Sequence, residues 1–184
     1  MSYRWIGQYR TNVHGPDLAF TYGKYAEDHL AGLDIATQFG DAGLRGEWTY
    51  TRPEFGAAYR KMVLGFDYVF ANSLSISMEA YYNSRSERDM AAQFAKRPLL
   101  AYLQPIGKRY LGMVIGYDLT PLVKMTTYVL ANRADHSTAV APTVTWSITE
   151  NTNMAGGAQF FSGSKESEYG RGDALYFIQM QYFF

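Results

Sequence analysis

The sequence predicts an all-β fold, an antiparallel transmembrane β-barrel of about 10 to 12 strands in an up-and-down meander. Apolar and polar residues alternate in short segments that are separated by turn residues. Aromatic residues make up 16% of the 184-residue chain, whereas charged residues make up only 18%, below the roughly 25% of an ordinary soluble domain. No segment approaches the run of about 18 apolar residues that a membrane-spanning helix needs.

Each predicted strand is a segment with one bulky apolar face. The last segment is the clearest, because apolar side chains on one face alternate with Gln179 and Gln181 on the other. Upstream, the segment 110–119 sets Asp118 and two glycines against its bulky side chains. The predicted strands are 2–12, 17–25, 31–39, 43–51, 59–70, 74–84, 109–119, 122–132, 137–149, 153–161 and 173–184.

Three features favour a membrane barrel over a soluble β-sandwich, which also alternates. The apolar face is rich in Tyr, Trp and Phe toward the strand ends, as an aromatic girdle at a lipid boundary requires. The opposite face consists mainly of Gly, Ala, Ser and Thr, whereas a soluble surface carries more Lys and Glu. Tight connections such as 71–72 and 149–152 alternate with long ones such as 52–58 and 162–172, the pattern of an outer-membrane barrel.

The predicted number of strands is odd, whereas single-chain bacterial barrels normally have even numbers. Either the segment 97–104 contains a further strand, or the single domain 1–184 is part of a larger barrel. The N-terminus has no apolar stretch or cleavage site of a signal peptide, which favours the second explanation, whereas the sequence RPLLAYLQ at 97–104 favours the first, and both stay open. The segment 86–109 breaks the alternation, and we expect a solvent loop there; a loop that folds into the barrel mouth is the alternative.

The face of small residues would surround the lumen of such a barrel. Charged and amide side chains there must be paired or hydrated. They would either tune the selectivity of a pore or fill a narrow barrel with ion pairs, depending on the number of strands. The predicted lining residues are Asp34, Gln38, Arg45, Glu47, Asp67, Glu79, Asp118, Lys124, Gln179 and Gln181.

The C-terminal sequence YFIQMQYFF at 176–184 resembles the assembly signal of Gram-negative outer-membrane barrels. The segments 43–53, 63–84 and 110–122 resemble successive hairpins of the porin-like family, and together the similar segments cover most of the chain. The resemblance implies a bacterial outer-membrane location, with the lipid bilayer and the barrel-assembly machinery as partners. That machinery reads the final strand by strand addition. The residues of the signal are Tyr176, Ile178, Met180, Tyr182 and Phe184.

We therefore expect a channel for passive diffusion of ions or small polar solutes, without enzymatic activity or cofactor. Seventeen basic and seventeen acidic residues balance, so no electrostatic attraction to nucleic acid is expected, and the absence of cysteine excludes thiol chemistry. A non-conducting structural or scaffold barrel is one alternative, and a soluble β-barrel that binds a lipophilic ligand is another.

A barrel hydrolase is a further alternative, centred on Asp135 and His136 beside Ser137. It would need a nucleophile and a base within hydrogen-bond reach, but the spacing of known barrel hydrolases is absent and ordinary turn chemistry explains these residues. His14 and His29 lie in predicted turns without a converging set of ligands, so no metal site is expected.

Overall fold

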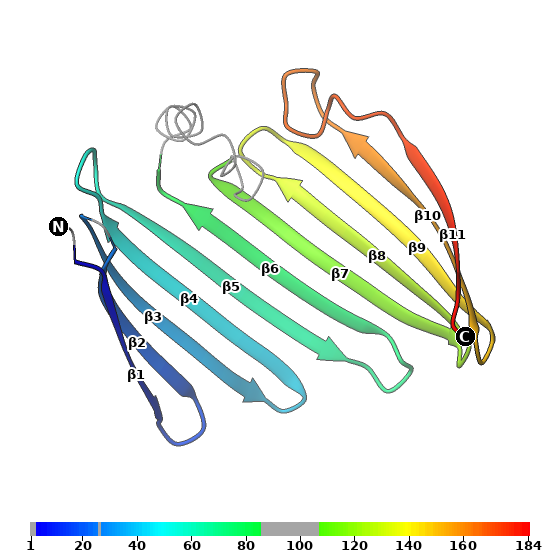
Figure 1. Ribbon diagram of the computed structural model, residues 1–184, viewed down its shortest axis with the longest axis horizontal. Coiled ribbons are helices and arrows are strands. Elements are labelled where there is room, and N and C mark those ends of the chain that lie inside the picture. The colour runs from blue at the N-terminus through cyan, green and yellow to red at the C-terminus, as the bar shows by residue number, and fades with distance from the viewer. Residues whose placement is uncertain (1–2, 26, 86–106) are drawn as a thin grey trace. The chain divides into compact units, whose positions relative to one another are not determined.

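The computed structural model describes residues 3–25, 27–85 and 107–184. Within them, eleven strands form one antiparallel sheet in which neighbours in sequence are neighbours in space (Figure 1). The strands are β1 (Trp5–Asn12), β2 (Asp17–Tyr25), β3 (Asp28–Phe39), β4 (Ala42–Arg52), β5 (Tyr59–Val69), β6 (Ser75–Asn83), β7 (Arg109–Thr120), β8 (Val123–Asn132), β9 (Ser137–Thr149), β10 (Thr152–Ser162) and β11 (Leu175–Tyr182). The predicted all-β up-and-down meander is confirmed. No helix in the described part of the chain is long and apolar enough to cross a membrane.

The eleven predicted strands all form, with small errors at their ends. The largest errors are at the beginnings of two strands, where a predicted start at residue 2 is observed at Trp5 and one at residue 31 is observed at Asp28. The segment 97–104, considered as a further strand, lies outside the described residues, and β6 and β7 are adjacent in the strand order.

Closure is the part of the predicted barrel that the structure does not show. In the strand order, β1 and β11 each have a single neighbour, so the sheet has two open edges. Contacts divide the chain into two compact units, Met1–Phe66 with Glu79–Arg109 and Asp67–Met78 with Tyr110–Phe184.

In the first unit, the register aligns apolar side chains across strands β1 to β4. Tyr9 lies opposite Phe20, Phe20 opposite Leu33, and Leu33 opposite Trp48. Directly opposed residues of an antiparallel pair point to the same face. One face of this unit is therefore apolar from strand to strand, as the alternation predicts.

The second unit has an equivalent apolar face. Met113 lies opposite Val129, Val129 opposite Val140, and Val140 opposite Phe160, so one row crosses strands β7 to β10. The neighbouring row on that face ends at the last strand, where Tyr176 lies opposite Ala158.

The sheet is a single layer without an apolar core. Among the described residues, the buried hydrophobic side chains are Tyr110, 6% exposed, and Ala158, 9% exposed. Large exposed hydrophobic side chains occur on every one of the eleven strands. A soluble β-sandwich covers such a face with a second sheet; here the described residues supply no such layer.

The connections alternate between tight and long, as predicted. Positions 40–41 and 150–151 are tight turns, whereas 53–58 and 163–174 are longer connections. Gly40 has φ of +61°, a left-handed conformation that suits glycine in a tight turn. The connection between β2 and β3 departs from the pattern, since only positions 26–27 separate the two strands.

Candidate pore-lining face and the loop that covers it

The face opposite the apolar one carries charges in the first unit. Asp34 of β3 lies opposite Ala19 on one side and Glu47 on the other, so the two carboxylates share one face of the sheet. Arg45, two residues before Glu47 on β4, lies opposite Ala36. The structure therefore places three of the predicted lining residues in two adjacent rows.

This polar face continues onto β1 and β2 through side-chain hydrogen bonds. Gln8 Nε2 donates to Thr21 Oγ1 at 3.1 Å, and Arg10 Nε donates to Gln8 Oε1 at 2.8 Å. At the turn, Asn12 Nδ2 donates to Asp17 Oδ1 at 2.8 Å. Sequence reasoning missed these residues, although period-two alternation would place them on the same face.

Arg45 reaches across the neighbouring strand because that strand has a glycine there. A Cβ atom built on Gly65 of β5 would lie 2.5 Å from both Cγ and Nε of Arg45. Any larger side chain at position 65 would displace the arginine. The small residues of the polar face therefore make room for its long charged ones. Gln38, another predicted lining residue, lies opposite Gly43 near the β3–β4 turn.

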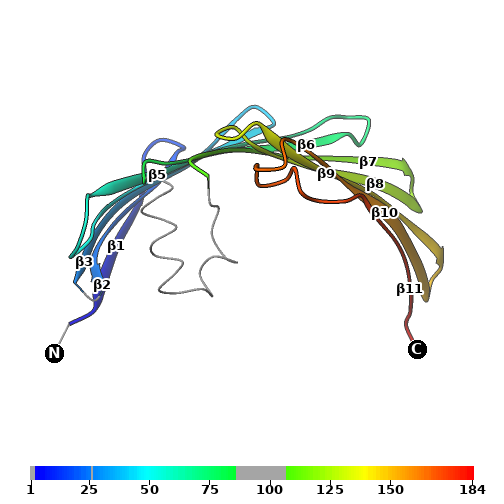
Figure 2. The same cartoon turned by 90° about the horizontal axis from the view of Figure 1, so that it is seen from above.

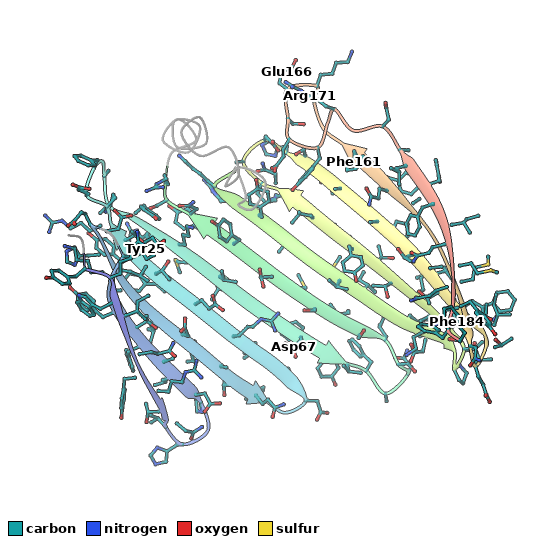
Figure 3. The ribbon with its side chains drawn as sticks, in the orientation of Figure 1. Tyr25, Asp67, Phe161, Glu166, Arg171 and Phe184 are labelled. Carbon is teal, nitrogen blue, oxygen red and sulfur yellow. The ribbon has the colours of Figure 1, made fainter. Side chains whose placement is uncertain are left out.

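The second unit holds the remaining predicted charges, except Glu79, which is exposed on β6 in the first unit. Lys124 Nζ lies 3.7 Å from Asp118 Oδ1, and both side chains are largely exposed. An exposed ion pair of this kind contributes little to stability. Asp67 is on β5 (Figure 3).

The last two predicted lining residues, Gln179 and Gln181, are on β11 in the second unit. They lie opposite Ala155 and Asn153 of β10.

The same face of the second unit also carries bulky side chains beside the small ones that the alternation predicts. Tyr128 lies opposite Ala141, and Phe177 lies opposite Gly157. A Cβ atom on Gly157 would lie 2.7 Å from the Phe177 ring. The expectation of a face dominated by small residues therefore holds in part, because here small residues accommodate large neighbours.

The β10–β11 loop, residues 163–174, bends over this face at the ends of β7 and β8 (Figure 2). Glu168 fixes it there: its Oε2 atom accepts hydrogen bonds from the Tyr110 hydroxyl at 2.5 Å and from Asn132 Nδ2 at 2.8 Å. Tyr110 and Asn132 are both buried. We call this arrangement the Glu168 clasp. It joins the loop to the polar face of the sheet.

A second set of contacts joins the loop to the β8–β9 turn through Asp135. Its Oδ2 atom accepts from the backbone N–H of Glu168 at 2.8 Å, and its Oδ1 accepts from the Ser137 hydroxyl at 2.7 Å. Burial disfavours the charged form, but the N–H groups of Glu168 and Ser137 and the Ser137 hydroxyl stabilise it more, so the pKa of Asp135 lies below its ordinary value.

Tyr169 completes the contact between the loop and the turn. Its backbone N–H donates to Ser137 Oγ at 3.3 Å. Burial, together with the nearby carboxylates of Glu168 and Asp135, raises the pKa of the Tyr169 phenol to about 12.

The loop is also organised within itself. Ser167 Oγ donates to the Ser164 carbonyl at 2.6 Å and accepts from the N–H of Gly170 at 3.2 Å. At the loop's tip, where Figure 3 labels Glu166 and Arg171, Arg171 Nε donates to the Lys165 carbonyl at 2.6 Å. Sequence reasoning identified this stretch only as a long connection.

The arrangement around Asp135 differs from that of a hydrolase. Ser137 is fully buried, with 0% exposure, whereas a nucleophile must reach its substrate. His136 is exposed in the turn with φ of +61°. The contacts of Asp135 and Ser137 hold the loop, which favours a structural role for both residues.

The residues of the proposed assembly signal share one exposed face of β11. Ile178, for example, is 80% exposed and lies opposite Gly156. Tyr176, Met180 and Tyr182 are exposed on the same face of this strand, and Phe184 lies just beyond the strand (Figure 3). Recognition by assembly machinery stays a prediction.

Within the described residues, no three His, Asp or Glu side chains gather as a metal-binding group. His14 is in the β1–β2 turn and His29 is on β3. Comparison of the chain with protein-family models, with curated proteins and with solved structures finds no match.

Proposed function

We propose that this sheet forms the wall, or part of the wall, of a bacterial outer-membrane β-barrel that lets ions or small polar solutes diffuse through a polar lumen. The observation that carries the proposal is a single-layer sheet with large hydrophobic side chains exposed on every strand, whose rows in the first unit separate an apolar face from one that holds Asp34 and Glu47. Monomeric soluble proteins rarely expose apolar patches larger than a few hundred Å². Lipid removes this cost, because hydrocarbon chains replace water on that face.

The open edges add a requirement to the proposal. Unpaired backbone N–H and C=O groups cost several kcal/mol each in hydrocarbon, so a sheet in lipid must close. Either β1 and β11 pair with each other, or further strands pair with both. The exposed apolar side chains of β11 suit the strand addition by assembly machinery that the resemblance implies.

The charges of the first unit give the lumen its proposed selectivity. Asp34 and Glu47 are direct cross-strand neighbours, and two carboxylates side by side attract cations and repel anions. Arg10, in the same row, and Arg45, in the next row, limit this preference. We expect a weakly cation-selective pore.

Single-channel recording tests this function. The chain would be refolded in detergent, inserted into a planar bilayer and compared with the double variant Asp34→Asn/Glu47→Gln and with Glu150→Gln, a matched control in the exposed β9–β10 turn. We expect discrete current steps whose cation preference falls in the double variant and is unchanged in the control. Steps of unchanged selectivity would remove these residues from the lining.

A non-conducting structural barrel is the second candidate, favoured by one observation. The Glu168 clasp holds a loop over the polar face, and Tyr128 and Phe177 add bulk to that face. If protein that is shown to be folded and inserted passes no current, the channel is excluded and this candidate takes its place.

A further inference from the structure

A row of basic residues crosses three neighbouring strands on the apolar face of the first unit. Lys24 of β2 lies opposite His29 of β3, and His29 lies opposite Arg52 of β4. All three point to the same face, since directly opposed residues share a face. Basic side chains are unexpected on a face that is otherwise apolar, so their position at the ends of the strands requires an explanation.

The rows beneath are ordered by polarity. Two residues further along the strands, roughly 7 Å away, Ala31 lies between Tyr22 and Tyr50. The row after that contains Leu33 and Trp48. Along this face, basic residues are followed by tyrosines and then by purely apolar side chains, the order in which a bilayer changes from headgroups to hydrocarbon.

A pocket of about 550 Å³ lies where the basic and tyrosine rows meet. Tyr22 and Tyr50 line it together with the small residue Ala31 that separates them. His29 and Arg52 line it as well. A notch between two tyrosines, bordered by a guanidinium and an imidazole, has the dimensions of a small-molecule site.

The pocket also contains acidic groups, so its charges are of both signs. Glu27 and Glu54 line it. Glu27 Oε2 lies 2.7 Å from Lys24 Nζ, and the backbone N–H of Glu54 donates to Asp28 Oδ1 at 3.1 Å. Among the described residues, the side chains of Arg52, His29 and Glu54 make no hydrogen bond or ion pair. One guanidinium and one carboxylate therefore remain available to a ligand.

We propose that this pocket binds the headgroup of a zwitterionic phospholipid that carries a phosphate and a primary ammonium. The planar guanidinium of Arg52 matches phosphate oxygens, with His29 beside it. The Glu54 carboxylate accepts from the ammonium, and the acyl chains run along the row of Leu33 and Trp48. The inference rests on the proposed function, because it requires the apolar face to contact lipid.

Quenching of tryptophan fluorescence by brominated lipids tests the site. Trp48 stacks on Tyr50 with ring centroids 6.4 Å apart, so it reports on the pocket, and the variant Trp5→Phe/Trp146→Phe leaves it as the only tryptophan. The full chain in maltoside micelles would be titrated with phosphatidylethanolamine, phosphatidylcholine and phosphatidylglycerol, each brominated on its acyl chains. We expect phosphatidylethanolamine to associate about fivefold more tightly than the other two, the effect of about one net hydrogen bond from its primary ammonium to Glu54, which neither of the other headgroups can donate from an ammonium.

Two variants assign the roles, each with a matched control of the same chemistry in an exposed turn of the other unit. Glu54→Gln should lower the affinity for phosphatidylethanolamine to that for phosphatidylcholine, whereas Glu150→Gln should change neither affinity. Arg52→Gln should weaken the binding of all three phospholipids, whereas Arg133→Gln should not. Heat-modifiable electrophoretic mobility shows that each variant is folded.

The outcomes separate this inference from the proposed function. If brominated maltoside quenches Trp48 but the three phospholipids associate equally, the apolar face contacts hydrocarbon and the headgroup site is wrong. If phosphatidylglycerol associates most tightly, the pocket is an anion site, and the role of Glu54 is wrong. If free phosphoethanolamine displaces the lipid at equal concentration, the site takes a soluble ligand. If no brominated molecule quenches Trp48, the lipid-facing sheet itself is refuted.

Discussion

Removing the carboxylate of Glu168 should release the β10–β11 loop from the sheet. In Glu168→Ala, the Tyr110 hydroxyl and Asn132 Nδ2 both lose their hydrogen bond to the loop. Tyr110 is 6% exposed and Asn132 is 4% exposed, so water reaches neither donor readily while the loop stays in place. The variant loses both hydrogen bonds that join the Glu168 side chain to the sheet, and loop opening is therefore the expected response.

The free-energy cost of removing the Glu168 carboxylate follows from the two hydrogen bonds. A hydrogen bond to a charged group contributes about 1.5–3 kcal/mol, so the pair sets an upper bound of about 3–6 kcal/mol. Glu168 itself is exposed, and solvent screening reduces the charged contribution. We take about 2 kcal/mol, which raises the population of the open loop about thirtyfold. Glu168→Gln keeps one acceptor oxygen and should have roughly half the effect in free energy.

Limited proteolysis measures this opening directly. Trypsin cleaves after Lys165 and Arg171, both within the loop, and cleavage of a transiently open segment follows its open population. In detergent-folded protein, Glu168→Ala should be cut about thirtyfold faster at these sites. Glu150→Ala, in the exposed β9–β10 turn, is the matched control and should be cut at the wild-type rate. Equal rates for Glu168→Ala and the control would refute the clasp.

Three further predictions concern pH and packing. The pKa of Asp135 is depressed in the folded protein, so the contribution of its carboxylate to loop docking is present above the ordinary pKa of 3.8 and is lost as the pH falls through the lower folded pKa. Hydrogen exchange of the loop amides should accelerate in that acid range. Asp135→Asn should remove this acid-induced acceleration. The pKa of Tyr169 is raised to about 12, so its contribution to stability is complete below its ordinary value of 10.0 and is lost as the pH rises through about 12. An absorbance titration of Tyr169→Phe should lack one phenolate that appears at about pH 12 in the wild type. Gly157→Ala would bring a Cβ atom to 2.8 Å from the Pro142 carbonyl oxygen, a backbone atom that cannot easily move, and should lower the free energy of unfolding by about 1–3 kcal/mol. Gly7→Ala, whose nearest neighbour is 3.9 Å away, is the control, and equal urea midpoints for the two variants would contradict the packing argument.

Most of the fold could be predicted because a strand's side-chain period is a local property. The alternation around Gln179 and Gln181 needs no knowledge of neighbouring strands, and β11 forms there with Gln179 opposite Ala155. The meander order could also be predicted, because a turn as tight as 150–151 can join only strands that pair antiparallel.

The loop contacts could not be predicted, because they join residues far apart in the sequence. Glu168 meets Tyr110 across 58 positions, and nothing in SGSKESEYGRG indicates which residues lie beneath it. Asp135 and Ser137 have the composition of an ordinary turn, and their role emerges only when Glu168 and Tyr169 are placed against them.

The two faces and the two edges of the sheet together constrain its environment. In water, large hydrophobic side chains exposed on every strand would favour aggregation, and open edges at β1 and β11 would offer backbone groups for pairing with other chains. Burying the apolar face in lipid removes the first problem but makes the second more costly, because lipid cannot hydrogen-bond the edges. Eleven strands in an antiparallel meander give β1 and β11 the same direction, so direct pairing between them would be parallel. An all-antiparallel closure therefore requires an odd number of additional strands between the two edges.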